Sequence, residues 1–402
     1  MRGFLGLIIT VFLIVESSFF ILSYKVFKLN TYLTGVLLLF TIFVYTFFIY
    51  QVTQLDRSVG VTHSFYWAIG FLLLNLVPKL IVLIFWLIGL LLISVFKGDA
   101  SAEMMQGRKE FISKLGLAIA AIPFFGIIHG IWKGKYNFKV INRSLAFKDL
   151  PEAFNGFKIL QISDLHSGSF DNAEKINYAV DLINKQDADL FLFTGDIVNT
   201  RAEEFHPWVE TFNKLKDFPQ GKYSVLGNHD YGEYVTWPNE EAKKANFEGI
   251  KGLHKKVNFE LLLNENRVIE KDGSQLKLVG VENWGKSFRK AGDLNLASAG
   301  IEPDDFKILM SHDPSHWEYE VKDHPKNFQL TLSGHTHGLQ FGIEIPGFIK
   351  WSPIQYVYKQ WAGFYKHADK YINVNRGFGF HAFPGRVGIW PEITVIELRK
   401  EA

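Results

Sequence analysis

The stretch that decides the fold is FKILQISDLH at residues 157–166, an apolar run that stops abruptly at polar residues. Four more stretches have the same shape: DLFLFTGDIV at 189–198, KYSVLGNHD at 222–230, FKILMSHD at 306–313 and LTLSGHTHG at 330–338. Each run is rich in β-branched and aromatic residues and has the length of a buried strand. We therefore predict five strands, each ending in residues that can bind a metal.

The polar residues at these strand ends are oxygen and imidazole donors. They are Asp164, His166, Asp196, Asn228, His229, Asp230, His312, His335 and His337. Open α/β folds place their chemistry at the ends of their strands, so we expect one shared site at the edge of a sheet. This set is too large for one tetrahedral ion, but it suits two ions about 3.5–4 Å apart that share a carboxylate, as in enzymes that attack phosphoryl groups.

The donor types limit the metal without identifying it. The chain has no Cys, which excludes thiolate zinc fingers and iron–sulfur clusters. Asp, Asn and His ligands suit Mn, Fe, Zn or Ni equally well. Taken singly, each motif has an ordinary alternative, since Gly-Asn is a common turn and a lone His312 is commonly structural. All five motifs together, each closing an apolar run, favour a metal site.

The order D-x-H, G-D, G-N-H-D, a lone His and G-H-x-H resembles the calcineurin-like metallophosphoesterase superfamily over residues 157–398. The resemblance implies that Asp164, His166, Asp196 and His337 hold the first ion. It implies that Asp196, Asn228, His312 and His335 hold the second, with Asp196 bridging. His229 would lie beside the scissile phosphate and protonate the leaving group, and Asp230 would orient His229 and fix its tautomer.

Three tail segments, GHTHGLQ (334–340), VNRGFG (374–379) and PGRVGIWPEITVIEL (384–398), are similar to a membrane-associated bacterial subgroup. That subgroup includes the UDP-2,3-diacylglucosamine hydrolases of lipid A biosynthesis. The resemblance implies hydrolysis of a phosphodiester or pyrophosphate bond in a lipid-linked substrate. A broad phosphodiesterase for envelope phospholipids or small phosphoesters is the alternative, and a non-catalytic scaffold is a minor one. Leu339 departs from the subgroup, which more often has a second Gly there.

Two features of the tail have open interpretations. Arg376 and Arg386 could bind a phosphate or sugar carboxylate, or could be ordinary structural arginines. Residues 345–366 mix Lys with aromatic residues, and could dock at a membrane interface, line an acyl-chain groove, or pack as a loop over the sheet.

The first third of the chain is a membrane region. Residues 1–96 contain only seven charged residues: Arg2, Glu16, Lys25, Lys28, Asp56, Arg57 and Lys79. We predict about four spanning helices at 4–24, 32–52, 65–96 and 111–131, since about 20 apolar residues cross a bilayer. Pro78 divides the third, which is either one long tilted helix or a re-entrant pair. Glu16 and the later spans argue against a cleaved signal peptide.

These spans predict a multi-pass protein, for which we expect a bacterial inner membrane, but the side of the catalytic domain stays open. Four spans put the N-terminus and the catalytic domain on one face, and the flanking Lys and Arg residues favour export only weakly. Residues 107–114, GRKEFISK, resemble a degenerate twin-arginine signal or the basic flank of an ordinary helix. An exported domain could not reach a nucleotide-linked lipid made in the cytoplasm.

The length of the second part of the chain and its order of strands and helices predict the fold class. Residues 1–131 form the membrane region, and residues 132–402 are of a size for one α/β domain. Strands alternate with helices, such as 172–187 with Asn172 as N-cap, and a strand-rich part follows at 274–282, 371–375 and 393–398. We predict two mixed β-sheets packed as a sandwich flanked by helices. The net charge of +2 gives no case for nucleic-acid binding.

Overall fold

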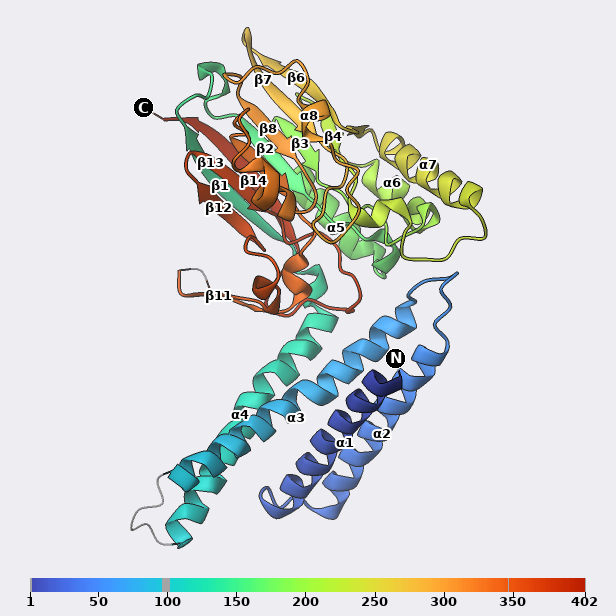
Figure 1. Ribbon diagram of the computed structural model, residues 1–402, viewed down its shortest axis with the longest axis vertical. Helices are drawn as coiled ribbons and strands as arrows, with labels where there is room; N and C mark the ends of the chain where they lie inside the picture. The colour runs from blue at the N-terminus through green and yellow to red at the C-terminus, as the bar shows by residue number, and fades with distance from the viewer. Residues whose placement is uncertain (1, 96–101, 346, 402) are drawn as a thin grey trace. The chain divides into compact units, whose positions relative to one another are not determined.

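The computed structural model describes residues 2–95, 102–345 and 347–401 (Figure 1). The chain divides into two compact units, of which the first comprises residues 1–55 and 61–132 and the second residues 56–60 and 133–402. The boundary at 132/133 falls one residue after the one expected from the sequence.

The first unit consists of long helices. They are α1 (Arg2–Lys25), α2 (Thr31–Thr53), α3 (His63–Val95) and α4 (Ala102–Trp132). Helix α3 packs against each of the other three. Helix α3 continues without a break through Pro78, so the segment is one long helix rather than a re-entrant pair. Its predicted end at residue 96 lies outside the described residues. At 1.5 Å per residue its 33 residues extend about 50 Å, more than a bilayer core requires without tilt.

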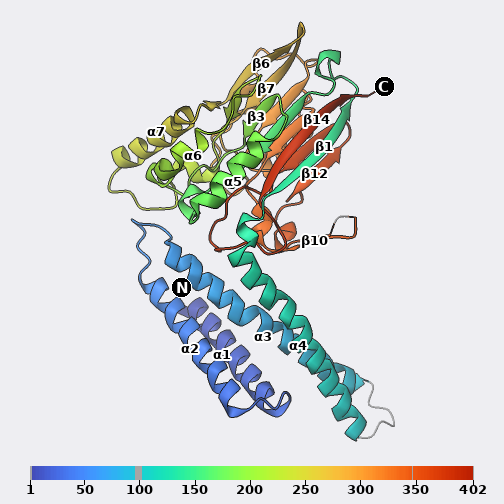
Figure 2. The same ribbon diagram turned by 180° about the vertical axis from the view of Figure 1, so that it is seen from behind.

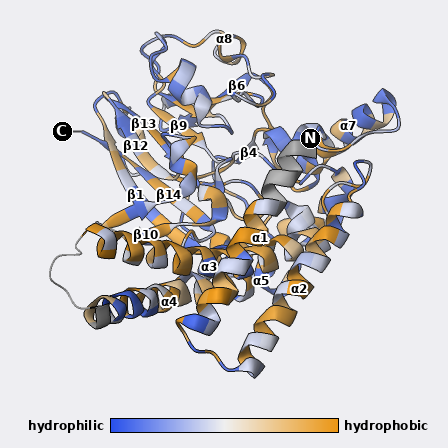
Figure 3. Cartoon of the chain, turned by 60° about the horizontal axis from the view of Figure 1, so that its bottom comes forward, coloured by the Kyte–Doolittle hydropathy of each residue, from blue (hydrophilic) through white to orange (hydrophobic). Residues whose placement is uncertain are grey.

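Apolar residues dominate these helices, as Figure 3 shows by colour. Among the described residues, Thr31–Thr53, His63–Val95 and Met104–Trp132 are long and apolar enough to span a membrane. The twin-arginine-like stretch 107–114 lies inside α4 as regular helix. Its role as an export signal stays a prediction.

The second unit is a sandwich of two mixed sheets, as predicted. The first sheet has the strand order β1-β14-β2-β3-β4-β5 and the second β12-β13-β9-β8-β7-β6, with a separate hairpin β10-β11. The strands are β1 (Lys139–Phe147), β2 (Lys158–Ile162), β3 (Leu190–Phe193), β4 (Lys222–Ser224), β5 (Glu260–Leu261), β6 (Glu265–Lys271), β7 (Ser274–Gly280), β8 (Lys307–Met310), β9 (Leu330–Ser333), β10 (Ile343–Ile345), β11 (Ile349–Trp351), β12 (Gly363–His367), β13 (Lys370–Val374) and β14 (Glu392–Lys400).

Alternation along the strands builds the core on both faces of each sheet. Ile159 of β2 packs between the sheets with Leu278 and Ile308, while the next residue, Leu160, faces the helices. Full burial of each such side chain stabilises the fold by about 1.5–3 kcal/mol. The sandwich is therefore held by two apolar layers on each sheet.

Helices α5 (Ala173–Asn184), α6 (Val209–Phe212) and α7 (Glu240–Lys256) cover the outer face of the first sheet (Figure 2). Short helix α8 (Leu294–Ala297) packs with the second sheet. The predicted helix at 172–187 is confirmed as α5. The side chain of Asn172 caps it by accepting from the Lys175 amide at 3.0 Å.

The five motif strands are β2, β3 and β4 in the first sheet and β8 and β9 in the second. Within each sheet they are parallel neighbours, so their carboxyl ends lie at one edge. We expected the ends at the edge of a single sheet. The structure instead brings the edges of both sheets together, because the sandwich aligns them.

Candidate metal centre

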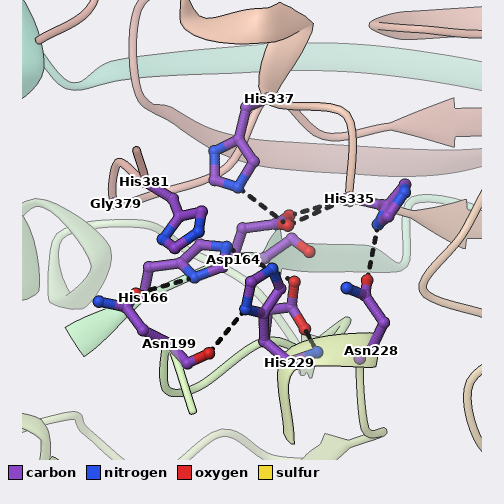
Figure 4. A network of polar contacts seen from close by, with 12 residues as sticks. Asp164, His166, Asn199, Asn228, His229, His335, His337, Gly379 and His381 are labelled. Carbon is purple, nitrogen blue, oxygen red and sulfur yellow. Dashed lines mark hydrogen bonds and ion pairs between the residues drawn. The ribbon is translucent and has the colours of Figure 1, made fainter. Parts of the chain in front are cut away.

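Most of the predicted ligands lie where a strand stops at a residue with left-handed backbone. The φ angle is 54° at Asp164, 47° at His166, 60° at Asp196, 72° at His335 and 50° at His337. Such residues each store roughly 1–3 kcal/mol of strain and cluster at functional sites. Here the sharp turn ends each strand and directs its polar side chain to the common edge (Figure 4).

The glycines of the motifs allow the strand-end loops to approach one another. A Cβ on Gly227 would collide with the carboxylate of Asp196, and a Cβ on Gly334 would collide with that of Asp164. The loops are joined by the Asp164 amide, which donates to Gly195 O at 2.9 Å, and by the His166 amide, which donates to Asp196 O at 3.1 Å. The Gly in G-N-H-D and in G-H-x-H is thus a packing requirement.

The ligands predicted for the first ion meet in one place. His337 Nε2 lies 3.3 Å from Asp164 Oδ1, and His166 Nε2 lies 3.5 Å from Asp196 Oδ2. Asp164, His166 and His337 form a group that could hold a metal ion, and all three are buried.

The ligands predicted for the second ion meet beside the first group. His312 Nε2 lies 3.1 Å from Asp196 Oδ2, and His335 Nδ1 lies 2.8 Å from Asn228 Oδ1. Asp196, His312 and His335 form another group of metal-binding geometry. Asp196 contacts ligands of both groups, which is the position that a bridging carboxylate needs.

These separations fit a ligand shell. An ion with bonds of about 2.0–2.2 Å places neighbouring ligand atoms roughly 3–3.5 Å apart. The four distances above lie within or close to that range. In the described part of the chain, Nε2 of His312 and Nε2 of His337 are buried without a hydrogen-bond partner. Unpartnered imidazole nitrogens facing carboxylates are the arrangement that a cation completes, so the residues fit divalent metal ions.

The far nitrogen of His312 fixes the orientation of its ring. His312 Nδ1 lies 2.7 Å from Thr194 O, and since a carbonyl only accepts, Nδ1 carries a proton and Nε2 is directed at the carboxylates. Burial lowers the pKa of His312, but Asp196 and Asp164 outweigh this effect and raise it to about 10. Despite its burial, the neighbouring histidines, His312 first, hold the pKa of Asp196 well below its usual range. These opposite shifts show that Asp164 and Asp196 attract positive charge, which a divalent cation would also supply.

Asp230 makes other contacts than those predicted for it, while the predicted role of His229 stays a prediction. His229 Nδ1 lies 2.7 Å from the main-chain oxygen of Asn199, which fixes the tautomer and leaves Nε2 available. We predicted that Asp230 fixes it. The structure corrects this, because Asp230 accepts from the amides of Asp196 and Gly227 at 2.9 Å and holds the backbone of both loops. A carboxylate adjacent in sequence points away from its neighbour's ring in this tight turn.

Three residues of the site were missed because no motif marks them. Asn199 Oδ1 contacts His166 Nδ1 at 3.1 Å, so Asn199 supports His166 as well as His229. The ring of His381 stacks on His166 with centroids 4.8 Å apart. Tyr234 stacks on His229 at 4.2 Å and contacts Asn228 at 2.5 Å. His381 lies two residues after the VNRGFG segment, which is the one sequence feature that could have indicated it.

Arg376 and Arg386 make contacts typical of structural arginines. Arg376 is buried and forms ion pairs with Glu344 and Glu392. Arg386 is completely buried, donates to Gly379 O at 2.8 Å and lies 3.0 Å from His337 Nδ1. The guanidinium of Arg376 is taken up by two carboxylates, and that of Arg386 contacts His337 through Nη2, while its Nη1 is buried without a hydrogen-bond partner among the described residues.

The chain matches two family models. Residues 1–135 match "Probable Calcineurin-like phosphoesterase, transmembrane domain", and residues 157–339 match "Calcineurin-like phosphoesterase". The two matched regions correspond to the membrane region and to the sandwich up to the loop that follows His337. Both parts of the predicted organisation are thereby represented in known families.

Individual relatives agree with these matches. The "Uncharacterized metallophosphoesterase YkuE" of Bacillus subtilis (strain 168) is 32% identical, over 62% of this chain and 82% of the relative. The "Phosphodiesterase YaeI" of Escherichia coli (strain K12) is 27% identical, over 73% and 100%. The "Transmembrane protein with metallophosphoesterase domain" of Danio rerio is 26% identical, over 71% and 62%. The resemblance identified from the motifs is confirmed: the chain is a multi-pass membrane protein of the calcineurin-like metallophosphoesterase family, a family of metal-dependent phosphoester hydrolases.

Proposed function

We propose that this protein uses two divalent ions to hydrolyse a phosphodiester or pyrophosphate bond in a lipid-linked substrate. The observation that carries the proposal is that Asp196 lies between two groups of possible ligands, 3.5 Å from His166 and 3.1 Å from His312. Asp164, His166, Asp196 and His337 would hold one ion, and Asp196, Asn228, His312 and His335 the other. When bound, the ions supply polarisation of the phosphoryl oxygens and an acidified water as nucleophile.

The protein's own groups position the reaction. Asp230 holds the loops after β3 and β4 together, which keeps Asp196 between the two groups. His229, with Nδ1 directed at Asn199 O, has Nε2 available to bind a phosphoryl oxygen and to pass a proton to the leaving oxygen. Asn199 and Arg386 hold His166 and His337 from behind.

Two features support a lipid-linked substrate. The catalytic unit continues directly from a membrane helix, and its tail segments resemble the UDP-2,3-diacylglucosamine hydrolases of lipid A biosynthesis. We propose that precursor as the substrate to try first. The name of the phosphodiesterase YaeI supports a second candidate, a broader phosphodiesterase of membrane phospholipids or small phosphoesters.

The reaction class is tested with the full chain in detergent, using bis(4-nitrophenyl) phosphate. We expect chelation to abolish hydrolysis and Mn²⁺ to restore it, with Fe, Zn and Ni as the other ions to compare. Asp196→Asn and Asn228→Ala should each lower the rate at least about 10²-fold, because each removes a ligand. Activity that survives chelation, or is unchanged in both variants, would contradict the two-metal proposal.

The substrate is tested separately by product analysis. Incubation with UDP-2,3-diacylglucosamine should release UMP, and hydrolysis of phospholipid diesters without UMP release would favour the broader phosphodiesterase. A reporter fused at the C-terminus decides which side of the membrane the catalytic unit faces. A cytoplasmic location is required for a nucleotide-linked lipid substrate.

A further inference from the structure

The catalytic unit carries a group of exposed apolar side chains beside the metal centre. Their exposed fractions are 86% for Phe348, 79% for Tyr356, 75% for Val357, 51% for Ile345 and 49% for Ile343. They belong to the hairpin β10-β11 and to the segment that follows it. We call these five residues the apolar patch.

The hairpin β10-β11 has one polar and one apolar face. On a soluble domain the apolar face would pack against the body of the domain, but here the polar face does. Ile343 and Ile345 share one face of β10, with Trp351 and Ile349 opposite them on β11. The other face carries Glu344 and Lys350, which bond to the body of the domain through Arg376 and through Ala362 O. Polar side chains therefore anchor the hairpin, while its apolar face is left exposed. That pattern indicates an apolar environment outside the domain.

Neighbours of the patch in the same segment are connected to the metal centre by hydrogen bonds. Tyr358 OH lies 2.8 Å from Nε2 of the ligand His335, and Ser352 Oγ donates to Gly338 O at 2.8 Å. Thr336 Oγ1, between the two histidines of G-H-x-H, donates to Trp361 O at 2.6 Å. The segment that carries the patch thus supports the ligand loop directly.

Leu339, near the hairpin in sequence, is exposed at a conformational cost. It lies two residues after His337, is half exposed, and has φ 53°, a region that favours glycine. The related subgroup more often has Gly at this position. A half-exposed leucine gains less from packing than a buried one, so burial within the domain does not by itself offset this strain.

The start of the catalytic unit leads to the same surface. The last membrane helix ends at Trp132, and Gly134 already packs against Arg386 O and the ring of Trp390. Val387, in that segment, accepts from the Gly342 amide at 2.9 Å and donates to Gln340 O at 2.7 Å. The hairpin is therefore joined to the part of the unit that immediately follows the membrane helix.

We propose that the apolar patch inserts into the headgroup–acyl boundary of the bilayer and holds the metal centre at the lipid surface. Aliphatic residues mixed with Phe, Tyr and Trp are typical of that boundary. The substrate class that fits is a phosphoester whose acyl chains stay in the membrane while its phosphate enters the site. This inference rests on the proposed function for its substrate, but insertion itself is independent of catalysis.

Insertion is tested with a single fluorescent label. The chain has no Cys, so Phe348→Cys in the full chain can be labelled uniquely, and Leu296→Cys, 59% exposed on α8, is the matched control. In vesicles of phosphatidylethanolamine and phosphatidylglycerol, nitroxide-bearing acyl chains should quench the label at 348 and not at 296. An unquenched, water-exposed label at 348 would overturn the proposal. A label shielded from water but not quenched by lipid would also overturn it, in favour of protein contact.

Catalysis gives a second readout. Phe348→Asp should lower hydrolysis of a 4-nitrophenyl phosphodiester carried on a diacyl lipid in vesicles by about tenfold, and leave bis(4-nitrophenyl) phosphate hydrolysis unchanged. Leu296→Asp should change neither rate. Equal rates on both substrates in Phe348→Asp would overturn the role in presenting lipid. Absence of both activities in the unmodified chain would refute the proposed function instead, and the quenching result would still decide insertion.

Discussion

Two clusters of buried charged residues, one in the membrane unit and one in the catalytic unit, differ in whether their charges are satisfied. In the membrane unit, Glu16 of α1, Thr41 and Tyr45 of α2, and Asn75 and Lys79 of α3 form one cluster. In the catalytic unit, the seven predicted ligands form the other. Both clusters bring together side chains from distant parts of the sequence. Removing their charged groups from water costs free energy.

The membrane cluster is closed. Lys79 Nζ has three protons and three acceptors: Glu16 Oε2 at 2.7 Å, Thr41 Oγ1 at 2.8 Å and Asn75 Oδ1 at 2.7 Å. Glu16 Oε1 accepts from Tyr45 and Asn75, both at 2.9 Å. With its ammonium fully used, the cluster has no group left for a ligand, and its effect is to hold three helices in register.

The metal centre is open by the same measure. Nε2 of His312 lies 3.1 Å from Asp196 and Nε2 of His337 lies 3.3 Å from Asp164, and both nitrogens are buried without a hydrogen bond to any described residue. The comparison teaches that complete pairing of buried charges indicates a structural role, whereas unpaired donor atoms at ligand spacing indicate a site for an ion. Three substitutions test this distinction.

The largest effect is expected for His229→Ala. His229 is close enough to Asp196 and His166 to be counted with them as a possible ligand. We assign it to the phosphate instead, so the variant should lose roughly 10³-fold in kcat while its bound metal is unchanged. If the variant loses bound metal as well as activity, measured on the same preparation, His229 is a metal ligand and belongs to the open cluster.

The next effect is expected for Lys79→Met, which opens the closed cluster. Leaving Glu16 buried without its partner should destabilise the membrane unit by about 3–5 kcal/mol, measured as the free energy of unfolding in detergent titrated with SDS. In the double variant Lys79→Met/Glu16→Gln, most of that loss should be recovered, because no unpaired charge remains. If the loss of unfolding free energy in the double variant equals the sum of the losses in the two single variants, the pairing of Lys79 with Glu16 does not stabilise the membrane unit.

A smaller effect is expected for Asn199→Ala. The variant keeps the main-chain oxygen that holds His229 and removes only the side chain behind His166. Affinity for the first ion should fall about 10–100-fold, with the kcat of the metal-saturated enzyme nearly unchanged. A large fall in kcat at saturating metal would show instead that Asn199 acts on the reaction directly.

The sequence predicted what local patterns determine. The strands and their terminal ligands, the cap at Asn172 and the apolar helices all follow from short-range order. The pairing of Glu16 with Lys79 could not be predicted, since the residues are 63 positions apart on different helices. The role of Asp230 was misjudged because its contacts depend on how two loops meet. Asn199 and His381 enter the site through the packing of the sandwich, which no motif records.

The central claim is that the open cluster binds two ions that share Asp196. The direct measurement is the metal content of the full chain, after chelation and equilibration with Mn²⁺, by mass spectrometry of a protein solution of known concentration. We predict two ions per chain, and fewer in both Asp196→Asn and Asn228→Ala. A fully active chain with one ion or none, or two ions retained in Asp196→Asn and Asn228→Ala, would contradict the account.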